Sequence, residues 1–135
     1  MKALDTNVLV RFLVNDDPAQ AQVVRERFRQ AETQREIFFV PLLVVLETIW
    51  VLDSAYGISR DELVAVLKDL LLLPILEFEN RSALQSMVYT AGASNFDLPD
   101  LLIAETARLA GCGSVLTFDQ KVAKSELFEL IMPVS

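Results

Sequence analysis

The chain has 135 residues, of which 53% are hydrophobic, and its 12 basic and 19 acidic residues give a net charge of -7. This length and apolar content favour one domain with a substantial core. The negative charge argues against a general nucleic-acid binder, and the absence of histidine excludes Ser-His-Asp hydrolysis, Cys-His nucleophiles and histidine-ligated metals.

Cysteine content and apolar segments indicate the compartment. The single cysteine, Cys112, excludes an intramolecular disulfide and a multi-cysteine zinc site, and we expect it to be a buried small residue. The most apolar run, from Ile37 to Leu46, is interrupted by Glu47 and is shorter than the ~20 residues that span a bilayer. The N-terminal residues show no basic, apolar and cleavage regions in sequence, so we expect no secretory signal. These features predict a cytoplasmic protein without a membrane span.

Strands and helices are expected to alternate along the chain. Short β-rich runs predict strands, and apolar residues at helical spacing, bounded by caps and prolines, predict helices. The predicted strands cover residues 2–4, 37–40, 75–78, 114–118 and 130–133. The predicted helices cover residues 6–14, 18–33, 42–55, 60–73, 81–92 and 97–111, with a short one at 120–125. This order predicts a single α/β domain over residues 1–135, with a mainly parallel central sheet of four to five short strands and helices on both faces.

Acidic residues fall at the places where such a fold puts its ligands. Asp5 and Asp119 each follow a predicted strand, Asp100 lies in the first turn of a predicted helix, and Glu47 lies inside an apolar helix. The carboxyl ends of parallel strands and the first turns of the following helices meet along one edge. Each acid also has a plainer reading. Asp5 could only cap its helix, Glu47 could occupy an exposed stripe, and Asp97 or Asp100 could be a cap.

Four converging carboxylates would repel one another and raise their pKa values unless a cation neutralised them. Oxygen ligands without histidine or cysteine select Mg²⁺ or Mn²⁺ over zinc or copper. Such an ion activates water and stabilises charge on a phosphoryl oxygen, so the expected reaction is phosphodiester hydrolysis.

Several of these motifs resemble those of a known family. Asp5-Thr6-Asn7, Glu47 in its apolar helix, Asp97-x-x-Asp100-Leu-Leu-Ile-Ala and Thr117-Phe118-Asp119 resemble the motifs of PIN-domain ribonucleases. The length and motif order resemble VapC toxins of type II toxin-antitoxin modules. The resemblance covers essentially the whole chain. It implies a PIN-like α/β/α sandwich and a Mg²⁺- or Mn²⁺-dependent endoribonuclease.

The resemblance also assigns roles to individual residues. The acidic quartet, which would bind the metal and orient the attacking water, consists of Asp5, Glu47, Asp100 and Asp119. Asn7 and Thr117 match supporting polar positions that orient these carboxylates. Asp97 matches an acidic position that only some members have, and helix capping is its alternative role.

The resemblance implies partners as well: an RNA substrate, a cognate antitoxin that blocks the site, and a homodimer. Arg11, Lys121 and Lys124 lie near the expected site and are candidates for RNA phosphate contacts, with plain solvation as the alternative.

Two other functional classes remain open at this point. An aspartate-nucleophile phosphatase also places an aspartate after its first strand, but it expects a second aspartate two positions later, where this chain has Asn7. A catalytically silent PIN-like or receiver-like module would bind a metal without hydrolysis. The intact quartet argues against that reading.

Overall fold

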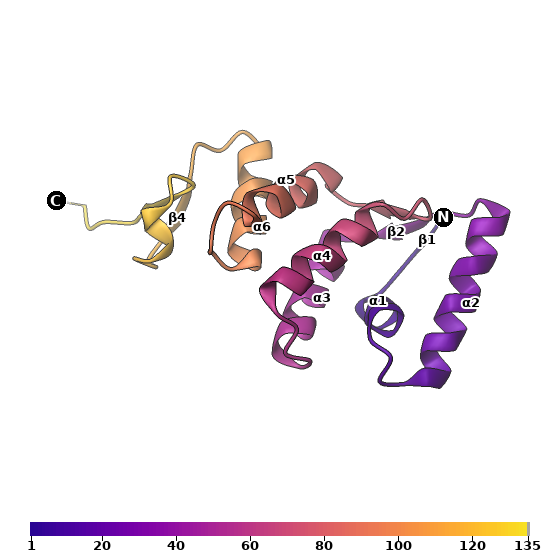
Figure 1. Ribbon diagram of the computed structural model, residues 1–135. Helices are drawn as coiled ribbons and strands as arrows, with labels where there is room; N and C mark the ends of the chain where they lie inside the picture. Colours follow the sequence, from indigo (N-terminus) through magenta and orange to yellow (C-terminus); the bar gives the residue numbers. More distant parts are fainter. Residues whose placement is uncertain (135) are drawn as a thin grey trace. The chain divides into compact units, whose positions relative to one another are not determined.

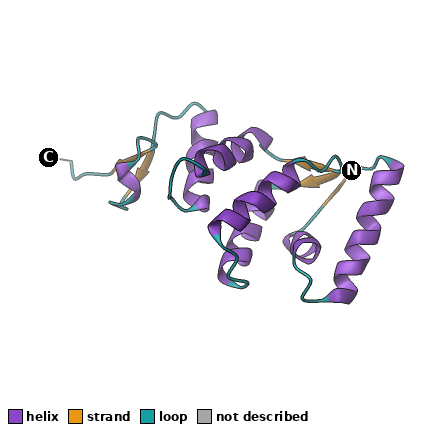
Figure 2. Cartoon of the chain, in the orientation of Figure 1, coloured by secondary structure: helices purple, strands orange, loops and turns teal. Residues whose placement is uncertain are grey.

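A computed structural model describes residues 1–134 and divides the chain into two compact units, Met1–Arg81 and the part from Ser82 onward. Both units combine helices with parallel strands (Figures 1 and 2). The α/β class expected from the sequence is therefore confirmed.

The first unit is built on a three-stranded parallel sheet in the order β1-β2-β3. Its strands are β1 (Lys2–Ala3), β2 (Phe38–Val40) and β3 (Leu76–Phe78). Two helices connect each strand to the next, as parallel pairing requires. They are α1 (Thr6–Leu13), α2 (Pro18–Gln34), α3 (Leu42–Ser54) and α4 (Arg60–Leu71).

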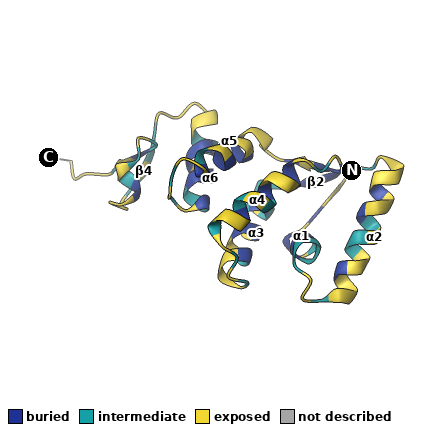
Figure 3. Cartoon of the chain, viewed as in Figure 1, coloured by how far each residue is buried: buried dark blue, intermediate teal, exposed yellow. Residues whose placement is uncertain are grey.

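Helix α1 packs on both α2 and α3, and so links the two crossover connections. The ring of Phe28 on α2 lies 4.8 Å from that of Phe12 on α1 and 5.7 Å from that of Phe38 on β2, measured between centroids. Such tilted pairs add to the stabilisation from buried apolar area. Along α3 and α4, buried and exposed residues alternate at helical spacing (Figure 3). The packing of α1 on α2 and α3 fixes the position at which α1 begins after β1.

The second unit contains α6 (Leu98–Leu109), most of α5 (Arg81–Ala91) and a pair of parallel strands, β4 (Val115–Thr117) and β5 (Phe128–Leu130). A short 3₁₀ helix, η1 (Val122–Lys124), lies between the strands. Ala104 of α6, Val122 and Phe128 form a buried cluster. This cluster anchors the segment that follows β4.

Three details differ from the sequence-based expectations. The last strand covers Phe128–Leu130 rather than 130–133, because Phe128 is the buried residue that pairs with Val115. Cys112 is exposed, since it follows Gly111 in the turn after α6. Asn80 precedes the helix predicted from residue 81, and the sequence predicts it as the N-cap of that helix, but its φ of 54° is left-handed instead of extended.

None of the helices within the described residues is long and apolar enough to cross a membrane.

Candidate functional site

Asp5 lies between β1 and α1 and is exposed. Its backbone is extended (φ -95°, ψ 174°), and its Oδ1 accepts a hydrogen bond of 3.2 Å from the Val8 amide. Asp5 is therefore the N-cap of α1, as the plainer reading expected. The hydrogen bond uses one carboxylate oxygen, so the other is available to a ligand.

Asn7 lies in the first turn of α1 and is exposed like Asp5. Both residues line an open cavity of about 430 Å³ next to helices α1 and α2. The first unit therefore places Asp5 and Asn7 beside the same open cavity.

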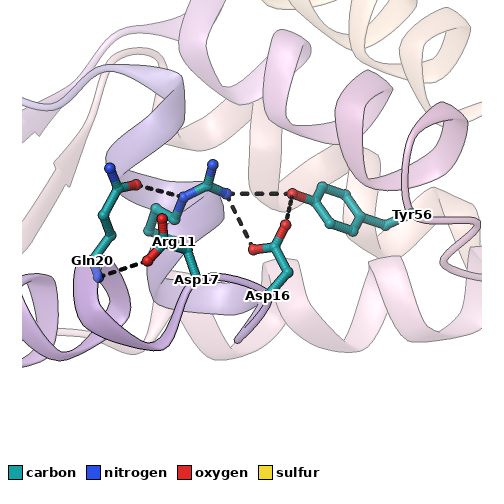
Figure 4. Close-up of polar contacts among 5 residues, drawn as sticks. All are labelled: Arg11, Asp16, Asp17, Gln20 and Tyr56. Carbon is teal, nitrogen blue, oxygen red and sulfur yellow. Dashed lines mark hydrogen bonds and ion pairs between the residues drawn. The ribbon is translucent and has the colours of Figure 1, made fainter.

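Arg11 also lines this cavity, and it belongs to a polar network (Figure 4). Its Nη1 donates to Asp16 Oδ1 (3.2 Å) and to the Tyr56 hydroxyl (3.3 Å). The Tyr56 hydroxyl donates to Asp16 Oδ2 (2.7 Å), and this bond, helped by the Arg11 charge, holds the pKa of Asp16 below its usual value. Asp16 therefore partly neutralises the positive charge of Arg11.

Glu47 lies on the exposed side of α3. Leu43 and Trp50 are exposed on the same stripe, with exposed fractions of 77% and 64%, whereas Val45 and Ile49 are buried. Among the described residues, Glu47 forms neither a hydrogen bond nor an ion pair. Its carboxylate is free to bind a ligand, and the exposed-stripe reading fits the same position.

Glu79 is an acidic residue that the sequence reasoning missed. It follows β3, and its Oε1 accepts a 2.7 Å hydrogen bond from the Leu42 amide at the start of α3. This bond satisfies an N-terminal amide of α3 where Pro41 supplies no side-chain cap. The available signal was an acid directly after an apolar strand, the same signal that identified Asp5 and Asp119.

The second unit brings three aspartates into electrostatic range. Burial first, and then the charges of Asp97 and Asp119, raise the pKa of Asp100 above its ordinary value. Asp100 lies in the first turn of α6, and Asp97 occupies the N-cap position. The Asp97 side chain forms no capping hydrogen bond, so its charge acts on Asp100 without being used at the helix end.

Asp119 is held by local backbone bonds after β4. Its Oδ1 accepts from the amides of Lys121 (2.9 Å) and Val122 (3.2 Å), while its own amide donates to Thr117 Oγ1 (3.0 Å). Thr117 therefore helps to fix the turn that carries Asp119. Lys121 and Lys124 are exposed beside this turn, and neither forms an ion pair with a described residue.

Glu105 is a second residue that the sequence reasoning missed. It lies on α6 with an exposed fraction of only 4%. Its carboxylate accepts from Thr90 Oγ1 (3.1 Å) and from Arg108 Nε (2.8 Å). Because a buried carboxylate requires such partners, Glu105 is best explained as a structural link between α5 and α6.

Within residues 1–134, no three acidic or cysteine side chains gather closely enough to hold a metal ion. The quartet is divided, with Asp5 and Glu47 in the first unit and Asp100 and Asp119 in the second. The electrostatic grouping that the structure shows is that of Asp97, Asp100 and Asp119.

Comparison with known proteins identifies the class. The family model for the PIN domain matches residues 2–126, so the chain belongs to the PIN domain family. Within that family the chain is VapC-like. It is 23% identical over 124 residues to the VapC ribonuclease of Aquifex aeolicus (strain VF5), an alignment that covers 92% of this chain and 91% of that protein.

Proposed function

We propose that this protein is a metal-dependent endoribonuclease that hydrolyses RNA phosphodiester bonds and acts as the toxin of a toxin-antitoxin pair. The observation that carries the proposal is the PIN-domain match over residues 2–126, which includes all four acids of the quartet. Similarity to a VapC ribonuclease supports RNA as the substrate.

The donor set fits a hard divalent cation. Asp5, Glu47, Asp100 and Asp119 offer only carboxylate oxygens, and the chain has no histidine. Oxygen-only ligation of this kind suits Mg²⁺ or Mn²⁺. Burial and the neighbouring carboxylates disfavour the charged form of Asp100 and so raise its pKa. A bound cation would stabilise that charged form. When bound, such an ion supplies an activated water and stabilises negative charge on a phosphoryl oxygen.

The residues of this chain hold and orient the reacting groups in this mechanism. The quartet carboxylates would hold the cation and would orient the attacking water. The amides of Lys121 and Val122 fix one oxygen of Asp119, and the Val8 amide fixes one oxygen of Asp5. These bonds limit carboxylate rotation and so preorganise the ligands. Asn7 and Thr117 are the supporting polar side chains, and Asp97 adds negative charge near Asp100.

The decisive experiment measures RNA cleavage by the purified protein, free of any antitoxin, with Mn²⁺ or Mg²⁺. We expect EDTA to abolish cleavage, and Asp5→Asn and Asp100→Asn to lower it at least ~100-fold, because each substitution removes a charged ligand. Asp69→Asn, at an exposed position of α4, is the matched control and should leave the rate unchanged.

Cleavage that survives in EDTA, or full activity of both quartet variants, would refute the proposal. Binding of divalent ions with no cleavage of any RNA would instead favour a catalytically silent metal-binding module. A phosphatase would form an acyl-phosphate on Asp5, and failure to trap this adduct separates that class from the nuclease.

The partners are part of the same proposal. We propose a single PIN-like domain over residues 1–135, a homodimeric state, a cytoplasmic location and a cognate antitoxin that blocks the acidic site. A basic inhibitory segment would complement the net charge of -7. Copurification of a small basic partner with the chain expressed from its native operon tests the antitoxin.

A further inference from the structure

The open cavity next to α1 and α2 combines apolar walls with a few polar side chains. Asp5 and Asn7 lie on its border, and Val8, Val23 and Val24 supply apolar walls. Its volume of about 430 Å³ is within the range of small-ligand pockets. Arg11 and Gln20 contribute its remaining polar groups.

The hydrogen bonds of Arg11 fix which atoms of this pair are free. Arg11 Nε donates to Gln20 Oε1 at 2.7 Å. A guanidinium has no acceptor, so the Gln20 amide must present its oxygen to Arg11 and turn its nitrogen away. Figure 4 shows Gln20 Nε2 and Arg11 Nη2 on the same side of the network, away from Asp16 and Tyr56. Within the described residues neither nitrogen has a hydrogen-bond partner, so Arg11 and Gln20, which both line the cavity, each keep one nitrogen donor unused.

The charges near the cavity decide which ligands with hydrogen-bond acceptors are favoured. Arg11 is paired with Asp16 at 3.2 Å, and Asp5 adds a carboxylate to the lining. A phosphate in this cavity would lie near the Arg11 guanidinium, whose charge is already paired with Asp16, and near the negatively charged Asp5. A neutral ring with acceptor atoms on its edge avoids that repulsion, satisfies both donors and covers the valine side chains.

We propose that this cavity binds one unpaired base of the RNA substrate and selects bases with two adjacent hydrogen-bond acceptors. Guanine offers N7 and O6, the pair that arginine reads in nucleic acids. Cytosine offers N3 and O2. Adenine and uracil place an N–H donor beside the corresponding acceptor, so they would leave one donor of the pocket unpaired. The inference rests on the proposed nuclease function and adds a base-specific subsite to it.

Gln20→Glu tests this assignment directly. The variant keeps an oxygen toward Arg11 Nε and replaces the free nitrogen by an acceptor. Residue 20 lies in the first turn of α2, after the N-cap Asp17, where an acidic side chain is favourable, so the variant should fold. Gln30→Glu adds the same charge to an exposed position of the same helix outside the pocket and serves as the matched control.

Binding is measured by fluorescence anisotropy with labelled pentauridylates whose central base is guanine, cytosine, adenine or uracil. The measurement is made in EDTA, so that binding does not depend on cleavage. We expect the wild type and Gln30→Glu to prefer guanine or cytosine by about tenfold, the scale of one good base contact. Gln20→Glu should lose this preference and gain affinity for adenine, whose amino group can donate to the new carboxylate.

Equal affinity for all four oligonucleotides, or an unchanged preference in Gln20→Glu, overturns the proposal. A pocket that takes up a peptide side chain instead of a base would give that first result. Metal-dependent cleavage without base preference would refute only this subsite. Base preference without any cleavage would refute only the proposed nuclease.

Discussion

Two threonine hydroxyls show how differently the same group is accommodated in this protein. Thr48 on α3 is buried, with an exposed fraction of 1%, and its Oγ1 has no hydrogen-bond partner within the described residues. Thr90 on α5 donates to the buried Glu105. The first hydroxyl carries a desolvation cost without a compensating bond, and the second satisfies a buried charge.

Replacing each threonine by valine should therefore change stability in opposite directions. We expect Thr48→Val to raise the free energy of unfolding by about 1 kcal/mol, because valine removes an unsatisfied buried hydroxyl at nearly constant volume. Thr90→Val should lower it by roughly 1–3 kcal/mol, because Glu105 loses a donor. Urea denaturation of both variants measures the difference, and the same sign for both would contradict this account.

Asp100 gives a pH dependence whose sign follows from its raised pKa. Since the folded protein holds the Asp100 proton more tightly than the unfolded chain, stability falls as pH rises from the ordinary value of 3.8 through the raised value. In metal-free protein, Asp100→Asn should therefore raise the melting temperature at pH 7, and the gain should vanish below pH 3.8. Thermal unfolding across this range checks it. A lower melting temperature for the variant at pH 7 would show that the Asp100 carboxylate is stabilised rather than strained.

At the scale of elements, the polar network ties three parts of the first unit together. Arg11 belongs to α1, Asp16 to the segment before α2, and Tyr56 to the turn after α3. Helix α1 begins at Asp5, and α3 carries Glu47. The network therefore restrains the two helices that position these carboxylates.

Tyr56→Phe should weaken this link in a way that can be titrated. The Tyr56 hydroxyl is the largest cause of the lowered pKa of Asp16, so its removal should move that pKa up toward the ordinary value of 3.8. A lowered pKa contributes stability above pH 3.8 that is lost as pH falls through the folded value, so the cost of the variant should be greatest near neutrality. Carboxyl ¹³C NMR titration measures the shift. Tyr89→Phe, at a residue that is 86% exposed, is the control and should leave Asp16 unchanged.

The elements themselves were largely predictable, because their signals are local. Asp17 before Pro18 and Ser59 before Glu62 mark helix starts, and both side chains accept a capping hydrogen bond. The last strand was misplaced because the sequence offers two adjacent apolar runs, and only the burial of Phe128 decides between them. Motif order names the acidic quartet, which stays a prediction. The roles of Glu79 and Glu105 depend on contacts across 37 and 15 residues, which local patterns do not contain.

For the whole molecule, the net charge of -7 sets how the protein would meet RNA. This negative charge repels RNA at long range, so contacts with RNA phosphates would have to come from a few local cations such as Lys121 and Lys124. Binding through few contacts is only weakly dependent on salt.

Lys121→Ala combined with Lys124→Ala tests this expectation. RNA affinity should fall for all sequences alike, and the slope of log K against log salt should become shallower by about 0.7 for each phosphate that a lysine no longer neutralises. Lys68→Ala, an exposed change on α4, is the control. An unchanged slope in the double variant would show that these lysines are only solvated.

The strand order of the first unit has a consequence for synthesis. Because β1, β2 and β3 are neighbours in the order in which the ribosome makes them, each new strand adds to one edge of a sheet that already exists. Asp5 and Glu47 can take their places in this sheet and its helices while the segment with Asp100 and Asp119 is still being translated. A ribosome that stalls before residue 100 would therefore release a partly folded protein without a complete acidic quartet. For the proposed nuclease, this order delays a complete set of ligands until the segment that carries Asp119 has been made.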